Sequence, residues 1–137
     1  MKLTHFMLIA GILLSAGCGR RNDPLPELVP VTGVVTLNGA PLPKANVTFH
    51  PLTSGDSSFG RTNEKGEFTL LYRGNAAGAV AGNHRVEIRT REEIVDRDGN
   101  LVSDQPELLP ARYHDKTTLT ADVHPGGPEI RFELKSK

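Results

Sequence analysis

Acidic and amide side chains gather in one short run of the sequence, Asp96-Arg97-Asp98-Gly99-Asn100. Oxygen atoms at alternate positions, with Glu107 further along, are the ligands that Ca²⁺ prefers. An EF-hand loop needs glycine at its sixth position for the sharp bend, and Leu101 stands there instead. The competing interpretation is a hairpin tip, in which an Asp-Gly turn lets the apolar residues on either side pair. We expect the hairpin, and keep Asp96, Asp98 and Asn100 only as weak candidate metal ligands.

Histidines are the other possible metal ligands in this chain. None of His50, His84, His114 and His124 has a close histidine or cysteine at the spacing that zinc sites use. We therefore expect no metal and no cofactor. His84 alternates with inward-facing residues and is expected to be buried, whereas His50 and His124 fall on outward faces, where a solvated side chain is the default.

Nucleophilic catalysis has no recognisable motif here. No serine lies in a Gly-x-Ser-x-Gly context, and the single cysteine is Cys18, near the start of the chain. We expect no catalytic residue and no enzymatic activity.

Residues 1–17 have the features of an export signal. Lys2 opens the segment, an apolar run covers Phe6 to Leu14, and Ser15-Ala16-Gly17 supplies small residues before Cys18. The apolar run is shorter than the roughly 20 residues that span a bilayer. The segment is therefore expected to be cleaved.

Small residues followed directly by cysteine resemble the bacterial lipobox, which implies that the Cys18 thiol carries fatty acyl chains such as palmitate. Leu14 lies one position further from Cys18 than the pattern usually places it, with Ser15 in between. An ordinary secretory signal with a chance cysteine is the alternative. Because Gly19, and not aspartate, follows Cys18, sorting to the outer membrane or cell surface is favoured.

Residues 18–30 form a polar segment rich in proline, with Pro24, Pro26 and Pro30 at close spacing. Proline favours extended backbone, so about 12 residues at ~3.1 Å each would reach roughly 35–40 Å. We expect a semi-rigid tether that holds a domain of residues 31–137 close to a membrane.

From Val31 onward, apolar and polar residues alternate with the period of a half-buried strand. Asn38-Gly39 and Asn63-Glu64-Lys65-Gly66 supply turns between such runs. The expected strands are short, and they cover residues 31–37, 45–50, 59–62, 68–72, 84–89, 118–123 and 129–135. This pattern predicts an all-β fold of two antiparallel sheets packed face to face, a β-sandwich of the immunoglobulin-like kind.

Several of these residues together resemble the carboxypeptidase regulatory-like domains. The similarity rests on turn glycines and core positions over roughly residues 31–90: Gly33-x-Val35, Gly39-x-Pro41-Leu42, Ala45-x-Val47-x-Phe49, Thr62-Asn63-x-x-Gly66-x-Phe68 and Gly82-x-His84-x-Val86-x-Ile88. The resemblance implies a transthyretin-like sandwich of seven strands. It also implies a non-catalytic module, since members of this group generally serve as accessory domains.

One transthyretin-like branch, the hydroxyisourate hydrolases, is enzymatic and ends in Tyr-Arg-Gly-Ser. Here Tyr72-Arg73-Gly74-Asn75 is similar but lies mid-chain and ends in asparagine, while the chain ends in Lys135-Ser136-Lys137. The similarity is therefore taken as accidental, and a small hydrolase is the least favoured hypothesis.

The segment Leu108-Leu109-Pro110-Ala111-Arg112-Tyr113 is the most apolar irregular stretch. We expect it to cover the edge of the sandwich, with presentation of Tyr113 to a glycan or protein as the alternative. Tyr72 and Tyr113 are weak candidate binding residues, because the chain has no Trp and only two Tyr.

The chain of 137 residues has sixteen basic and sixteen acidic side chains, and no basic patch of the kind that binds nucleic acid. The leading expectation is a monomeric, lipid-anchored protein of a bacterial envelope, whose β-sandwich is a structural or interaction module for an envelope protein. The alternative is a module that binds surface polysaccharide or peptidoglycan.

Overall fold

The computed structural model describes residues 23–137, so the predicted signal peptide and Cys18 lie outside the described residues. Strands dominate this part of the chain, which contains no α-helix and two short 3₁₀ turns, η1 (Arg73–Asn75) and η2 (Ala111–Tyr113). No helix among these residues is long and apolar enough to cross a membrane. The all-β prediction is confirmed.

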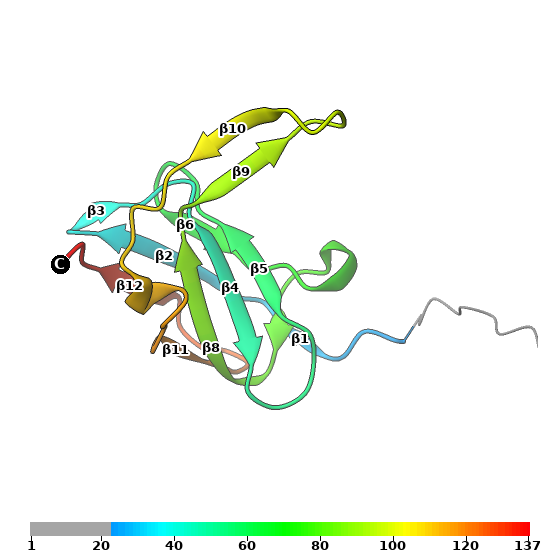
Figure 1. The fold of residues 1–137 in the computed structure, drawn as a ribbon. Helices are drawn as coiled ribbons and strands as arrows, with labels where there is room; N and C mark the ends of the chain where they lie inside the picture. Colours follow the sequence, from blue (N-terminus) through cyan, green and yellow to red (C-terminus); the bar gives the residue numbers. More distant parts are fainter. Residues whose placement is uncertain (1–22) are drawn as a thin grey trace, which may run out of the picture.

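One sheet has four strands in the order β11-β8-β4-β5, with every neighbouring pair antiparallel (Figure 1). These strands are β4 (Asn46–Pro51), β5 (Ser58–Arg61), β8 (Gly82–Arg89) and β11 (Thr120–Val123). β4, β8 and β11 follow the alternating pattern in the sequence, because β-branched and aromatic residues such as Val47, Phe49 and Val86 suit a pleated surface that is buried on one side. Below, we call this sheet the β4–β8 sheet.

The second sheet is built around β2 (Thr32–Leu37). Its other strands are β3 (Ala40–Pro41), β6 (Glu67–Thr69) and β12 (Ile130–Leu134). β3 and β6 pair with β2 antiparallel, but β12 pairs with β2 in parallel, from Ile130 beside Gly33 to Leu134 beside Leu37. The prediction of purely antiparallel sheets is therefore wrong for this pair.

Two further strand pairs stand apart from the main sheets. β1 (Leu28–Val29) pairs with β7 (Ala79–Val80), and β9 (Glu92–Val95) pairs with β10 (Leu101–Gln105). The expected tether therefore ends earlier than Pro30, since Leu28 already pairs with Val80 and Val29 is buried.

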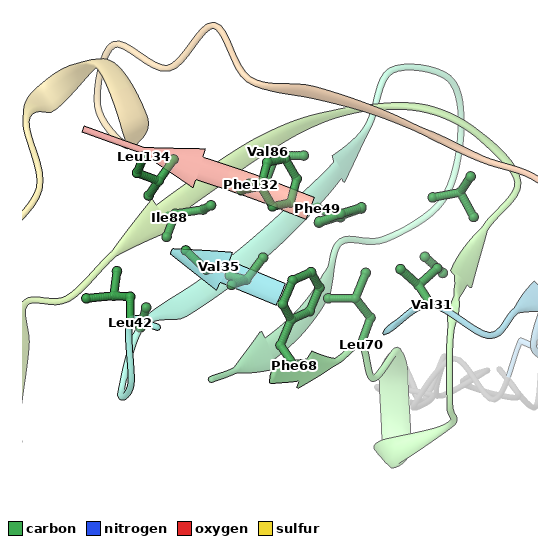
Figure 2. Packing of buried hydrophobic residues seen from close by; sticks show 14 of the residues in the cluster. Val31, Val35, Leu42, Phe49, Phe68, Leu70, Val86, Ile88, Phe132 and Leu134 are labelled. Atoms are coloured by element: carbon green, nitrogen blue, oxygen red, sulfur yellow. The ribbon is translucent and has the colours of Figure 1, made fainter. Parts of the chain in front are cut away.

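The core lies between the inner faces of the two main sheets, as in a β-sandwich (Figure 2). Phe49 of β4 is fully buried, and its ring centroid lies 6.3 Å from that of Phe68 and 6.1 Å from that of Phe132. The same core includes Val35 and Leu134 from the second sheet and Val86 and Ile88 from the first. Burying each of these aliphatic side chains contributes about 1.5–3 kcal/mol.

Glycines at two turns allow the strands of the second sheet to meet. Asn38 and Gly39 have φ values of 51° and 84°, as the Asn-Gly turn predicts. Gly66 has a φ of 73°, and a Cβ added there would lie 2.4 Å from the carbonyl oxygen of Val35. Gly66 therefore satisfies a close backbone contact as well as a left-handed turn.

Alanine substitutions at Gly66 and Gly39 separate the cost of the close backbone contact from the cost of the positive φ. Both Gly66→Ala and Gly39→Ala place a side chain at positive φ, which costs about 1–2 kcal/mol. A Cβ at position 39 meets nothing within 4 Å, whereas at position 66 it collides with backbone. We expect Gly66→Ala to lower the free energy of unfolding by at least about 2 kcal/mol more than Gly39→Ala in urea titrations. Equal losses would contradict the close-contact explanation.

Candidate functional site

The outer face of the β4–β8 sheet is polar and carries one exposed aromatic ring. Because neighbouring strands are in register, Phe59, Thr48 and Glu87 form one row across β5, β4 and β8. Arg61, Asn46 and Arg89 form the next row. Side chains in such rows lie about 4.5–5.5 Å apart at Cβ and interact directly.

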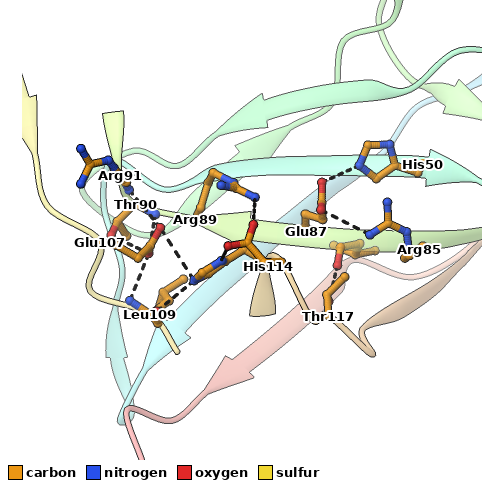
Figure 3. A network of polar contacts seen from close by, with 12 residues as sticks. His50, Arg85, Glu87, Arg89, Thr90, Arg91, Glu107, Leu109, His114 and Thr117 are labelled. Carbon is orange, nitrogen blue, oxygen red and sulfur yellow. Dashed lines mark hydrogen bonds and ion pairs between the residues drawn. The ribbon is translucent and has the colours of Figure 1, made fainter. Parts of the chain in front are cut away.

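Three side chains on this face, Ser57, His50 and Glu87, form a hydrogen-bonded array, of which Figure 3 shows the contact between His50 and Glu87. His50 Nδ1 lies 2.8 Å from Ser57 Oγ, and His50 Nε2 lies 2.7 Å from Glu87 Oε2. Burial alone would raise the pKa of Glu87, but the hydrogen bond from His50 and the nearby Arg85 outweigh it and hold that pKa below its ordinary value. An ionised Glu87 accepts the Nε2 proton, which assigns Nδ1 as the acceptor for the Ser57 hydroxyl.

The array has the same order of residues as the serine–histidine–carboxylate triad of serine hydrolases. The imidazole ring is reversed, because here Nδ1 faces the serine and Nε2 faces the carboxylate. The sequence gives no direct signal for it, because Ser57 and Glu87 lie 7 and 37 residues from His50. His50 does lie on the outer face as predicted, but it is hydrogen-bonded through both nitrogens and not simply solvated. Acyl transfer would also need oxyanion donors and a bound substrate, so the array by itself assigns no reaction.

A groove runs beside the exposed edge of this face. It has a volume of about 540 Å³ and is lined mainly by β5, β6 and their connections, including Phe59, Arg61, Asn63, Glu67 and Leu71. Phe59 is 58% exposed, although phenylalanine is one of the residue types most often buried. The inward positions of β5 belong instead to the small residues Ser58 and Gly60, which turns the Phe59 ring outward.

The β9–β10 hairpin confirms the predicted Asp-Gly turn. Asp96 Oδ1 accepts hydrogen bonds from the backbone N–H groups of Asp98 and Asn100, both at 2.9 Å. The Asn100 side-chain amide donates to Asp96 Oδ2 at 3.2 Å. The three candidate calcium ligands are thus close together, but Asp96 and Asn100 act as acceptor and donor within the turn.

Four large apolar side chains of this hairpin are exposed to solvent. The exposed fractions are 46% for Ile94, 58% for Val95 and Leu101, and 64% for Val102. Among residues 23–137, β9 and β10 pair with each other and with no third strand, and the hairpin extends away from both main sheets (Figure 1). The sequence predicts the pairing of Val95 with Leu101, but Ile94 pairs with Ser103 because the register shifts between Leu101 and Ser103. It does not predict the exposure of these side chains.

The base of the hairpin is held by one carboxylate (Figure 3). Glu107 accepts hydrogen bonds from the backbone N–H of Thr90 at 3.0 Å and of Leu109 at 3.1 Å, and from the Thr90 hydroxyl at 3.0 Å. Its second oxygen accepts from the Arg91 N–H at 3.3 Å. Burial would raise the pKa of Glu107, but these donors outweigh it and keep that pKa below its ordinary value.

The candidate tyrosines and the segment around Leu109 pack or form hydrogen bonds within the domain. Tyr72 is buried, and its hydroxyl accepts a hydrogen bond from the Asp56 N–H at 2.9 Å, so little of its ring is exposed to a partner. Tyr113 packs against the core and accepts from the Lys135 N–H at 2.9 Å. Leu109 is buried, which confirms that this segment covers the edge of the sandwich.

The histidines are dispersed, and no group of three potential ligands that could hold a metal occurs in the described part of the chain. His84 is buried against Phe49 as expected, with ring centroids 5.6 Å apart and Nδ1 donating to the Gly82 carbonyl at 3.0 Å. Burial lowers the pKa of His84, so its ring is neutral. His124 lies on the surface beside Asp122.

Comparisons with known proteins identify no family. No family model matches the chain, and no curated protein matches it. A 9R-lipoxygenase from Cyanothece PCC8801 has a similar solved structure, with a TM-score of 0.40 and 13% sequence identity. The match covers 79% of this chain but only 16% of the lipoxygenase. A similarity this distant assigns no activity.

Glu107→Gln tests the role of the carboxylate at the base of the hairpin. The amide offers one acceptor oxygen in place of two, and its NH₂ group would face N–H donors, so we expect a loss of about 2 kcal/mol in the free energy of unfolding at pH 7. Because the pKa of Glu107 is lowered in the folded state, its contribution is present above the ordinary value of 4.5 and is lost as the pH falls through the folded value. The difference between the two proteins should therefore shrink in acid.

Hydrogen exchange adds a local measurement to the same comparison. The amides of Thr90, Arg91 and Leu109 should lose protection in Glu107→Gln and not in Glu129→Gln, which removes an exposed carboxylate. Unchanged protection of these three amides would show that Glu107 does not hold the hairpin.

Proposed function

We propose that this protein is a non-catalytic interaction module, anchored by lipid at Cys18 to a membrane of the bacterial envelope. The observation that carries the proposal is the position of the exposed hairpin relative to the point where the chain enters the domain. The predicted signal peptide and lipobox supply the anchor. The hairpin supplies exposed apolar side chains that do not pack in the core and are therefore available for contact with a partner.

The chain enters the domain at one end of β8, and the hairpin leaves from the other end. β1 pairs with β7, which ends two residues before β8 begins at Gly82. β8 ends at Arg89, and β9 begins at Glu92. Eight residues of strand span about 26 Å, so the hairpin base lies about that far from the entry point (Figure 1). A domain tethered through residues 18–27 can therefore direct the hairpin away from the membrane.

The domain is further proposed to be carboxypeptidase regulatory-like, with a transthyretin-like strand arrangement. The residues of the resemblance have roles in the framework. Thr62 is buried, and its hydroxyl accepts the Ala45 N–H at 2.8 Å, while Asn63 Oδ1 accepts the N–H groups of Lys65 and Glu67. A motif whose members hold turns and strands together supports a shared framework and not a shared activity.

The anchor is tested by metabolic labelling with an alkyne analogue of palmitate in cells that express the full chain. We expect label on the wild-type protein and none on Cys18→Ser, because only Cys18 offers a thiol. Ser15→Leu, which restores the usual lipobox spacing, should keep the label. An unlabelled wild-type protein, or label that persists in Cys18→Ser, would exclude the anchor.

The second candidate function, binding of envelope glycans, is favoured by one observation, the exposed Phe59 ring in the groove beside Arg61, Asn63 and Glu67. Glycans bind to sheet surfaces through exposed aromatic rings, with polar side chains at the rim to hydrogen-bond the hydroxyl groups. Phe59 therefore replaces Tyr72 and Tyr113 as the candidate aromatic residue for contact with a glycan.

Co-sedimentation with isolated cell-wall polysaccharide tests this second function. If it is right, binding is saturable, free glycan competes, and Phe59→Ser weakens binding about fivefold to tenfold, since one aromatic contact contributes about 1 kcal/mol. Leu52→Ser is the matched control, because Leu52 is 61% exposed but lies outside the groove. Equal binding by wild type and Phe59→Ser would exclude the groove as the site.

A further inference from the structure

We propose that the β9–β10 hairpin binds an extended, cationic and apolar segment of another protein, which adds as a third strand along β9. The proposal rests on the function proposed above, namely that the domain is an interaction module, and it names the chemistry of the partner.

The hairpin is rigidly held at its base although it adds nothing to the core. Glu107 fixes the backbone on both sides of the base through Thr90, Arg91 and Leu109. Gln105 adds a hydrogen bond from its side-chain amide to the Lys44 carbonyl at 2.8 Å. Arg61 of β5 pairs with Glu92 at the start of β9. A two-stranded ribbon is marginally stable in water by itself, so these contacts hold it in a defined orientation.

Both edges of the ribbon have unpaired backbone groups, but only β9 is regular. β9 and β10 pair only with each other among residues 23–137. The register shifts between Leu101 and Ser103, so a bulge interrupts β10. Bulges are a common way to block an edge against pairing. The open row of donors and acceptors along Glu92–Val95 is therefore the edge to which a strand can add.

The charge of the hairpin indicates what kind of strand fits. Residues 92–105 carry five carboxylates and one guanidinium, a net charge of −4 in a chain whose formal net charge is zero, and Arg61 and Arg91 from outside this range pair with two of the carboxylates. Glu93 and Asp104 are directly opposite each other, and like charges in that position destabilise a strand pair. Arg91 lies beside Glu93, but Asp104 has no cation of its own among the described residues. A cationic side chain on the added strand would relieve this repulsion.

The same features argue against two other occupants. A second copy of the hairpin would bring together two hairpins that each carry a net charge of −4 over residues 92–105. An anionic bilayer would repel the same carboxylates, and the hairpin leaves the domain at the end away from the predicted anchor. Apolar contact with Ile94 and Val95, combined with lysine or arginine opposite Glu92 and Glu93, fits a cationic protein segment.

The experiment uses the lipidated full chain in phosphatidylcholine nanodiscs and a fluorescent peptide, Thr-Val-Ile-Lys-Lys-Thr. Added antiparallel to β9, this peptide places its apolar pair opposite Val95 and Ile94 and its lysines opposite Glu93 and Glu92. Two matched peptides accompany it, one with glutamates for the lysines and one with N-methylated backbone amides. Fluorescence anisotropy gives the affinity of each.

We expect the lysine peptide to bind, with an affinity that falls as salt is raised. The glutamate peptide and the N-methylated peptide should bind at least about tenfold more weakly. Val95→Thr combined with Leu101→Thr should weaken binding by a similar factor, whereas Leu52→Thr, at an equally exposed position elsewhere, should not. Glu93→Lys combined with Asp104→Lys should reverse the preference toward the glutamate peptide.

Four results would overturn the proposal. They are equal binding of the lysine and glutamate peptides, full binding of the N-methylated peptide, concentration-dependent self-association that Val95→Thr with Leu101→Thr abolishes, and binding of the hairpin to anionic vesicles without peptide. Because the lipid is verified separately by palmitate labelling, failure of the hairpin test leaves the anchor intact. If the labelling fails, the same peptide measurements are made on the full chain without nanodiscs, and their outcome still tests the hairpin.

Discussion

Phe49 lies where the two main sheets meet, fully buried and in contact with the rings of Phe68, Phe132 and His84. A strand has a side-chain period of two, so fixing Phe49 and Val47 inward forces Thr48 and His50 outward. The same constraint passes through the register to β5 and β8, where it places Phe59, Arg61 and Glu87 on the outer face. This single packing requirement therefore determines the position of the groove and of the Ser57–His50–Glu87 array. It also determines the row that contains Arg61 and Arg89.

The interactions that hold the fold differ greatly in what they contribute. Most ion pairs of the outer face, such as Arg89 with Asp115 at 3.1 Å, are exposed to solvent, which screens them, so they contribute little to stability. Glu107 is different, because its oxygens accept several backbone and hydroxyl donors at a partly buried site. His84 acts in the opposite direction. Its ring is buried and neutral, and its Nε2 has no hydrogen-bond partner among residues 23–137, so folding opposes protonation of this residue in acid.

Alternation and turn residues predict which strands form but not how distant strands pair. The strands around Val35, Val47 and Val86 could be predicted, as could the turns at Gly39, Gly66 and Gly99, since both signals are local. The parallel pairing of β12 with β2 could not, because residues about one hundred positions apart in the sequence meet there and no local pattern encodes direction. The exposure of Phe59 could not be predicted for a related reason. Hydrophobicity predicts burial, but Ser58 and Gly60 occupy the inward positions of β5, and Ser58 donates to the Gly78 carbonyl at 3.0 Å. The Ser57–His50–Glu87 array likewise depends on the register of three strands.

The hairpin combines two requirements that normally conflict in β-proteins. An exposed, apolar strand edge offers affinity for an extended segment, yet the same edge invites pairing between copies of the chain. The carboxylates interspersed along this hairpin separate the two outcomes. They make the homotypic complex repulsive while leaving a heterotypic, cationic complex attractive, and the bulge in β10 removes one of the two edges. Fixing the base through Glu107 then reduces the conformational entropy that a partner would have to remove on binding. An acidic hairpin with a fixed base is therefore better suited to binding one class of partner than a flexible apolar loop of the same length would be.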